Sequence, residues 1–167
     1  MNPLFQAMLP EVVLAAVACL LLLLGAVDSA KVRKAVPVIA LLGLVAVFAY
    51  EIAQDPTAPA IQDSAGTFFV YHLAHYIKMI ASGIGVLFVL LAWPSNKNGT
   101  GNASIDFGAE CGEFFGLMLL SITGIFLVAG ANDLMLLFLG IELASLPTYI
   151  MVSISRPIAA AQEAGVK

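Results

Sequence analysis

Charged side chains are scarce in this chain. Its 167 residues include 7 Lys and Arg and 11 Asp and Glu, whereas 61% are hydrophobic. No soluble core could hide so many apolar side chains, so a soluble globular protein is excluded. The few basic residues lie between hydrophobic runs and form no basic face, which argues against nucleic-acid binding. The composition predicts a protein that is embedded in a lipid bilayer.

Cysteines and cofactor motifs are also nearly absent. Cys19 and Cys111 have neither a metal-ligand spacing nor a paired framework, so we expect both to be packing thiols. No Gly-rich phosphate loop, cysteine cluster or flavin motif is present, so we expect this chain to bind no cofactor and no metal. A cleaved signal peptide is also disfavoured, because Glu11 precedes the first apolar stretch and no basic segment does.

Long hydrophobic runs fill most of the sequence. They cover about residues 8–27, 35–50, 68–93, 114–129 and 133–153. Each is near the roughly 17 to 25 residues that cross a bilayer as a helix, so the predicted fold is an all-α integral membrane protein with about five transmembrane helices. Only a short connector around Gly130 and Asp133 separates the last two runs, which predicts a tight antiparallel hairpin. Arg156-Pro157 ends the fifth helix, and the pattern then starts a sixth.

Basic residues occur in alternate connections. The connections after the first, third and fifth runs hold Lys31, Arg33, Lys34, Lys97, Arg156 and Lys167. The other connections hold none, so the positive-inside rule predicts an outside N-terminus and a cytoplasmic C-terminal segment.

Glu142 is the carboxylate nearest the middle of the last run, and no other lies between Leu134 and Ser155. An acidic side chain at the centre of a bilayer costs roughly 2.5 to 3.5 kcal/mol, and such residues usually mark an ion or proton path. The alternative is a protonated structural glutamate that bonds a neighbouring helix. Pro147 leaves the carbonyl of Leu143 without its helical donor and should loosen the helix beside the carboxyl group.

Other polar residues in the runs support two interpretations each. Ser145 and Tyr149 lie near the face of Glu142 and could extend a hydrogen-bonded chain. Lys78 is a second intramembrane charge, which could carry protons or could pair with an acidic neighbour. His72 and His75 have no carboxylate or cysteine to complete a metal site, so an interfacial role is favoured.

Small residues indicate close helix packing. Gly112 and Gly116 form a GxxxG pattern at the start of the fourth run. Gly83 and Gly85 have no side chains and so make the third helix narrower at that point. Two glycosylation sequons, at Asn98 and Asn102, lie in a connection that is predicted to be on the inner side, so modification there is not expected.

Several motifs together resemble subunit N of the proton-translocating NADH-quinone oxidoreductase, respiratory complex I. They are GEFF at 112–115, ANDL at 131–134, LFLGIELASLPTY at 137–149, EAGVK at 163–167 and LPE at 9–11. Members of that family are much longer and contain two inverted repeats of five helices. The resemblance therefore implies an N-terminal portion of an antiporter-like fold: residues 1–110 with three N-terminal helices and a linker, 111–155 with two helices of the first repeat, and 156–167 entering the next helix.

The resemblance also implies a function. Glu142 matches a glutamate that pairs with a lysine on the broken seventh helix, which is absent here, and Lys167 matches a further lysine of the proton path. The chain would be a membrane-arm subunit of a translocase in the cell inner membrane. NADH, FMN, iron-sulfur clusters and quinone would be bound by other subunits, and a downstream chain would supply the remaining helices. Two alternatives remain. The chain could be a non-catalytic scaffold or assembly component, or it could be a subunit of a related cation/proton antiporter or membrane-bound hydrogenase.

Overall fold

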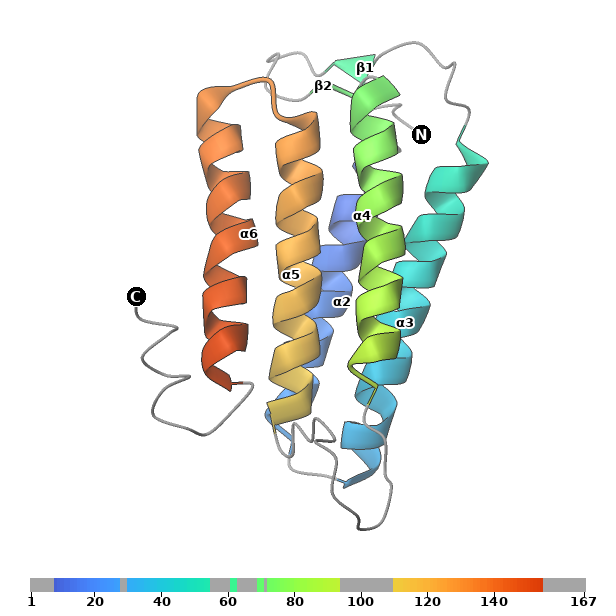
Figure 1. The fold of residues 1–167 in the computed structure, drawn as a ribbon, viewed down its shortest axis with the longest axis vertical. Coiled ribbons are helices and arrows are strands. Elements are labelled where there is room, and N and C mark those ends of the chain that lie inside the picture. The colour runs from blue at the N-terminus through green and yellow to red at the C-terminus, as the bar shows by residue number, and fades with distance from the viewer. Residues whose placement is uncertain are drawn as a thin grey trace.

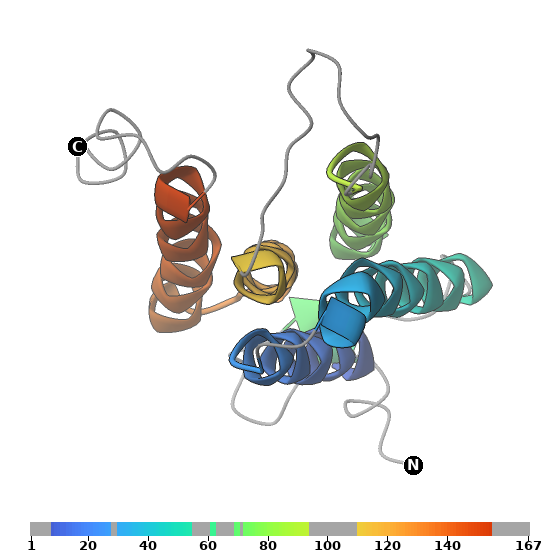
Figure 2. The same ribbon diagram turned by 90° about the horizontal axis from the view of Figure 1, so that it is seen from below.

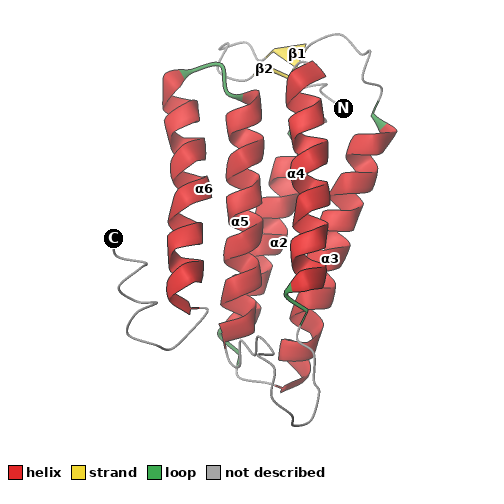
Figure 3. Cartoon of the chain, in the orientation of Figure 1, coloured by secondary structure: helices red, strands yellow, loops and turns green. Residues whose placement is uncertain are grey.

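The computed structural model describes residues 8–27, 30–54, 61–62, 69–70, 72–93 and 110–154. Within these ranges the chain is almost entirely helical (Figures 1 and 3). The helices are α2 (Leu9–Gly25), α3 (Ala30–Ala53), α4 (His72–Leu91), α5 (Cys111–Gly130) and α6 (Leu134–Ile154). Two short strands, β1 (Ile61–Gln62) and β2 (Phe69–Val70), pair antiparallel between α3 and α4. The predicted all-α fold with five helices is confirmed, and the predicted sixth lies outside the described residues.

Local sequence explains the helix ends that are seen. Pro10 occupies the first turn of α2, where a missing N–H costs nothing. Gly130 ends α5, and Asp133 directly precedes α6, with its carbonyl accepting the Leu137 N–H at 2.9 Å. Helices α5 and α6 are thus joined by three residues and pack along each other, which confirms the predicted hairpin.

Two predicted boundaries differ from the structure by about four residues or more. Helix α3 begins at Ala30, because Lys31, Arg33 and Lys34 are good helix formers and extend the apolar run. Helix α4 begins at His72 and not near residue 68, because Phe69–Val70 pairs with Ile61–Gln62. Both differences leave the number of described helices unchanged.

Helix α5 is the centre of the bundle. It contacts α2, α3, α4 and α6, and the view along the helices places it in the middle (Figure 2). One core runs through the bundle; among its most deeply buried members are Leu14, Leu21, Leu44, Phe115, Leu119 and Phe126. Helix α6 packs mainly on α5, and only 11% of its apolar span is buried. Most of the surface of α6 is therefore uncovered.

Glycines bring α5 close to its neighbours. A Cβ on Gly112 would lie 2.8 Å from the Gly25 nitrogen, and one on Gly116 would lie 2.8 Å from Leu22 Cγ. On α4, a Cβ at Gly85 would come within 2.6 Å of Ile122 Cδ1. These approaches confirm that the predicted glycines serve helix packing.

Four helices are long and apolar enough to cross a membrane. Their candidate spans are Val32–Ala53, Leu73–Leu91, Cys111–Gly130 and Leu134–Ile154, and α2 is a shorter apolar helix. Many large hydrophobic side chains on the outside of the bundle are exposed, as a bilayer solvent permits. Cys19 is among the exposed residues, so its predicted packing role is wrong, whereas Cys111 is buried at the start of α5.

Candidate functional site

Glu142 lies inside α6, eight residues after its first residue. At 1.5 Å per residue, it is about 12 Å from one end of the helix and about 18 Å from the other. Its side chain is half-buried. The structure thus places this carboxyl group deep in a candidate membrane span, as the sequence predicts.

The orientation of Glu142 follows from the contact between α5 and α6. Gly140 faces α5, because a Cβ there would lie 3.0 Å from the Val128 nitrogen. At about 100° per residue, Glu142 is about 200° further round the helix and lies on the opposite face. Within the described residues no ion pair involves Glu142. The carboxyl group is therefore directed toward a side of α6 that the described helices leave open.

Close backbone packing fixes α6 in position beside α5. A Cβ on Gly124 would lie 2.5 Å from the Ala144 nitrogen and 2.8 Å from the Gly140 carbonyl oxygen. The Ser121 hydroxyl donates to the Ala144 carbonyl at 2.9 Å. Gly140 and Ala144 lie on either side of Glu142 in the sequence. Their contacts with α5 therefore fix the position of Glu142 along the axis of the bundle.

The backbone after Glu142 is irregular in its hydrogen bonding. Pro147 lies inside α6 and is buried, so the Leu143 carbonyl has no N–H donor at the usual helical position. The Ser145 hydroxyl donates to the Ile141 carbonyl at 2.8 Å, and the Thr148 hydroxyl donates to the Ser145 carbonyl at 2.6 Å. Tyr149 is exposed. The segment after Glu142 therefore contains hydroxyl groups and a weakened helical ladder.

An apolar groove of about 660 Å³ runs between α4, α5 and α6. Ile80, Phe88, Ile125 and Met151 are among its lining residues, and Glu142 is not. Its lining is mostly apolar, and the hydroxyl groups of Ser121 and Thr148 are also part of it.

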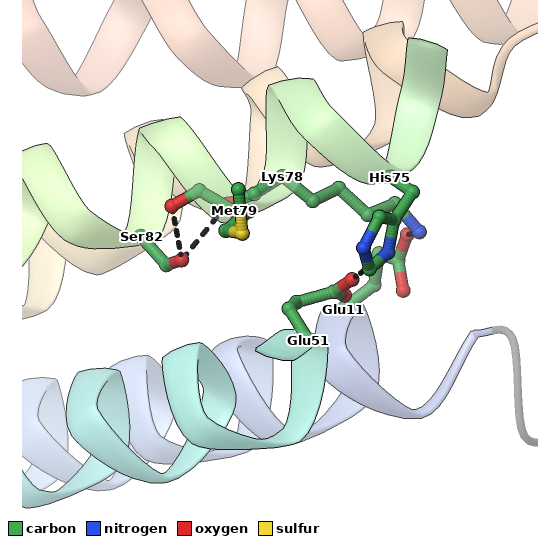
Figure 4. Close-up of polar contacts among 6 residues, drawn as sticks. All are labelled: Glu11, Glu51, His75, Lys78, Met79 and Ser82. Carbon is green, nitrogen blue, oxygen red and sulfur yellow. Dashed lines mark hydrogen bonds and ion pairs between the residues drawn. The ribbon is translucent and has the colours of Figure 1, made fainter. Parts of the chain in front are cut away.

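Lys78 lies in a second polar region, on α4, which packs against α3 and α5. Its ammonium group is 2.5 Å from Glu11 Oε1 on α2, and both side chains are buried (Figure 4). The ammonium also lies 5.9 Å from the centre of the Phe126 ring on α5. The acidic neighbour that the sequence offered as one alternative is thus present, and a role of Lys78 in proton transfer stays a prediction.

A second pair lies beside the first. His75 Nδ1 is 3.0 Å from Glu51 Oε2, and Figure 4 shows the imidazole next to the Lys78 and Glu11 side chains. The hydroxyl of Ser82, one turn further along α4, donates to the Lys78 carbonyl at 2.9 Å. Among the described residues, no group of three or more His, Cys, Asp or Glu side chains could hold a metal ion.

Sequence reasoning missed Glu51 and the pairing of these four groups. The predicted second helix ended at Tyr50, which left Glu51 in a linker. Alternating helix directions were a usable signal, because the start of α2, the end of α3 and the start of α4 must share one end of the bundle. Lys167, the other predicted site residue, lies outside the described residues.

No protein-family model matches the chain. Individual proteins do match it, and those named here are NADH-quinone oxidoreductase subunits N. The subunit from Azorhizobium caulinodans is 31% identical over 165 residues, which are 99% of this chain and 33% of the relative. The subunit from Methylobacterium nodulans is 33% identical over 162 residues, 95% of this chain and 31% of the relative.

A shorter region is more similar still. The subunit from Gemmatimonas aurantiaca is 47% identical over 64 residues, which are 38% of this chain and 12% of the relative. The chain spans about one third of the length of the first two relatives. The resemblance predicted from the motifs is confirmed, and together with the apolar helices it supports a multi-pass membrane protein.

Proposed function

We propose that this chain, similar over nearly its full length to subunit N of NADH-quinone oxidoreductases, is a membrane-arm component in which Glu142 carries protons. The observation that carries the proposal is the position of this carboxyl group. It lies deep in an apolar helix, on the face away from α5, with no ion pair among the described residues.

The chemistry follows from the low dielectric constant around α6. An isolated carboxyl group there favours its neutral form, and a cation brought nearby favours the carboxylate. Moving the cation toward or away from Glu142 therefore unloads or loads one proton. We propose that the cation is a lysine on a later helix, supplied by a longer protein or a downstream chain.

Pro147 and the hydroxyl groups near it would serve the transfer. The Leu143 carbonyl is free of its helical donor and can accept a hydrogen bond from water or from a side chain. Ser145, three residues after Glu142, adds a hydroxyl group close to the same face. A short wet path beside the carboxyl group is the expected result, and Lys167 would lie further along it.

In this proposal, cofactor binding and electron transfer are carried out by other subunits. Other subunits would bind NADH, FMN, iron-sulfur clusters and quinone, and their electron transfer would drive proton movement through the membrane arm. The chain would lie in the cell inner membrane with its N-terminus outside. Residues 1–110 would be the N-terminal helices, 111–155 the first two helices of a repeat, and 156–167 the entry to the next.

Redox-driven proton uptake in inverted membrane vesicles tests the proposal, with assembly of the complex checked on a native gel. Glu142→Gln keeps the shape of the side chain and removes its proton exchange, so we expect uptake to fall strongly with assembly intact. Glu113→Gln is the matched control, because Glu113 is an exposed glutamate in the first turn of α5.

Two results would contradict the proposal. Unchanged uptake in Glu142→Gln would leave the carboxyl group with a structural role, as in a scaffold component. Sodium-coupled uptake without any dependence on NADH would instead favour a cation/proton antiporter.

A further inference from the structure

The four side chains at the β1–β2 end of the bundle do not balance in charge. Glu11 and Glu51 are two carboxylates, Lys78 is one ammonium, and His75 is neutral unless it is protonated. With a neutral imidazole the cluster carries a net charge of −1. A buried net charge is costly, so one more cation at this place is favoured.

The geometry indicates where that positive charge is held. Glu11 is already engaged by Lys78 at 2.5 Å, and the Phe126 ring faces the ammonium from α5. Glu51 is engaged by the imidazole at 3.0 Å. A single proton on the line between His75 Nδ1 and Glu51 Oε2 makes both pairs neutral overall and gives Glu51 a charge-assisted hydrogen bond.

Burial indicates how such a proton would enter. The exposed fractions of the Lys78, Glu11 and Glu51 side chains are 2%, 4% and 5%, whereas that of His75 is 14%. The imidazole is three residues into α4, about 5 Å from the start of the helix. His75 is thus the member of the cluster that water at this end can reach.

We propose that His75 and Glu51 form a proton-binding site at the β1–β2 end of the bundle, which the Glu11–Lys78 ion pair holds in place. The imidazole takes a proton from a hydronium ion, which leaves as water, and shares it with the Glu51 carboxylate. This site is separate from Glu142, and its existence does not depend on the function proposed for Glu142.

Each helix packed against the pair contributes a defined neighbour. Helix α2 contributes Glu11, and α3 contributes the phenol of Tyr50, which lies within electrostatic reach of both carboxylates. On α4 the Tyr76 ring stands edge-on to the imidazole, 5.7 Å between centres. On α5 the Phe126 ring lies 5.9 Å from the Lys78 ammonium. Glu11 Oε2 is buried without a hydrogen-bond donor among the described residues, so this side of the cluster has unused capacity for a proton or a donor.

The charge state of the imidazole is the quantity to measure. The chain has 2 histidines, so 15N-histidine labelling of the full chain in lipid bilayers gives a simple nuclear magnetic resonance spectrum. At neutral pH we expect one imidazolium signal with a carboxylate-bonded nitrogen, which disappears in His75→Gln. If both imidazole rings of the wild-type chain stay neutral at every pH at which the protein remains folded, the proposal is overturned. No variant is needed for this result.

Variants at Glu51 test the pairing. Removing a charged partner within 4–6 Å changes proton affinity by about tenfold or more, so Glu51→Gln should lower the imidazolium fraction correspondingly. Glu51→Asp should restore it, because the carboxylate returns. Tyr76→Phe is the control: it keeps the neighbouring ring and should leave the fraction unchanged. An imidazolium fraction in Glu51→Gln equal to wild type would overturn the pairing.

The same spectra distinguish a proton from a metal cation. When sodium replaces choline in the buffer at constant ionic strength, the imidazolium signal should stay unchanged. Loss of that signal in sodium would mean that the ion competes for the cluster, and would overturn the assignment of the site to a proton.

Discussion

Lys78 on α4 and Glu11 on α2 form a buried ion pair with 2.5 Å between Nζ and Oε1. The pair connects the first and third of the described long helices at one level of the bundle, although 66 residues lie between the two positions in the chain. Neither side chain reaches solvent, and each compensates the buried charge of the other.

Removing the ammonium alone should destabilise the bundle. Lys78→Met leaves the Glu11 carboxylate buried without its ion-pair partner, which typically costs about 3–5 kcal/mol. The double variant Glu11→Gln with Lys78→Met should recover a large part of that loss. Unfolding free energy in bilayers is the measurement. Lys34→Met, at an exposed lysine of α3, is the control and should be close to neutral. Equal stability of the single and double variants would contradict the pairing.

The α5–α6 interface should reject a methyl group at Gly124. Its Cβ would meet the Ala144 nitrogen at 2.5 Å, and overpacking of this kind costs about 1–3 kcal/mol. We therefore expect Gly124→Ala to lower thermal stability and to loosen α6. Gly83→Ala is the matched control, because its Cβ would lie 3.4 Å from Phe48 Cε2, an ordinary contact. Equal melting temperatures for the two variants would refute close packing at Gly124.

The hydrogen bond from Ser121 to the Ala144 carbonyl should contribute a small stabilisation. Interhelical hydrogen bonds in membrane proteins average about 0.6 kcal/mol, with a maximum near 1.7, so Ser121→Ala should lose an amount in this range. Thr123→Val is the comparison, because the Thr123 hydroxyl donates within its own helix to the Leu119 carbonyl. Unfolding free energy in bilayers is the measurement: the Ser121 variant should lose more stability than the Thr123 variant, and an equal loss in both would contradict the interhelical bond.

Pro147 should make the middle of α6 exchange its amide protons more easily. Pro147→Ala supplies the missing N–H to the Leu143 carbonyl, so exchange around residues 143–148 should slow. Hydrogen–deuterium exchange followed by mass spectrometry measures this. Pro37→Ala, at the proline inside α3, should slow exchange in α3 and leave α6 unchanged. Slower exchange in α6 in both variants would show a general effect on the bundle.

Much of the fold could be predicted from the sequence because a bilayer restricts the possibilities. Apolar runs of sufficient length must be helical there, since no water is present to satisfy open backbone groups. The hairpin of α5 and α6 followed from Gly130 and Asp133, and the depth of Glu142 followed from counting residues along one run. These properties depend on neighbours along the chain.

The tertiary structure decided which distant groups meet. The sequence presents Glu11, Glu51, His75 and Lys78 in three separate segments, and any of them could have faced lipid headgroups. Their pairing depends on the rotation of α2, α3 and α4 about their axes, which is set by the packing of these helices against α5 and of α3 against α2 and α4. The same holds for Glu142. The sequence determined that a carboxyl group lies deep in an apolar helix, and only the contact of Gly124 with Gly140 and Ala144 decided that it turns away from the bundle, because rotation about a helix axis is fixed by side-chain packing and not by hydrophobicity.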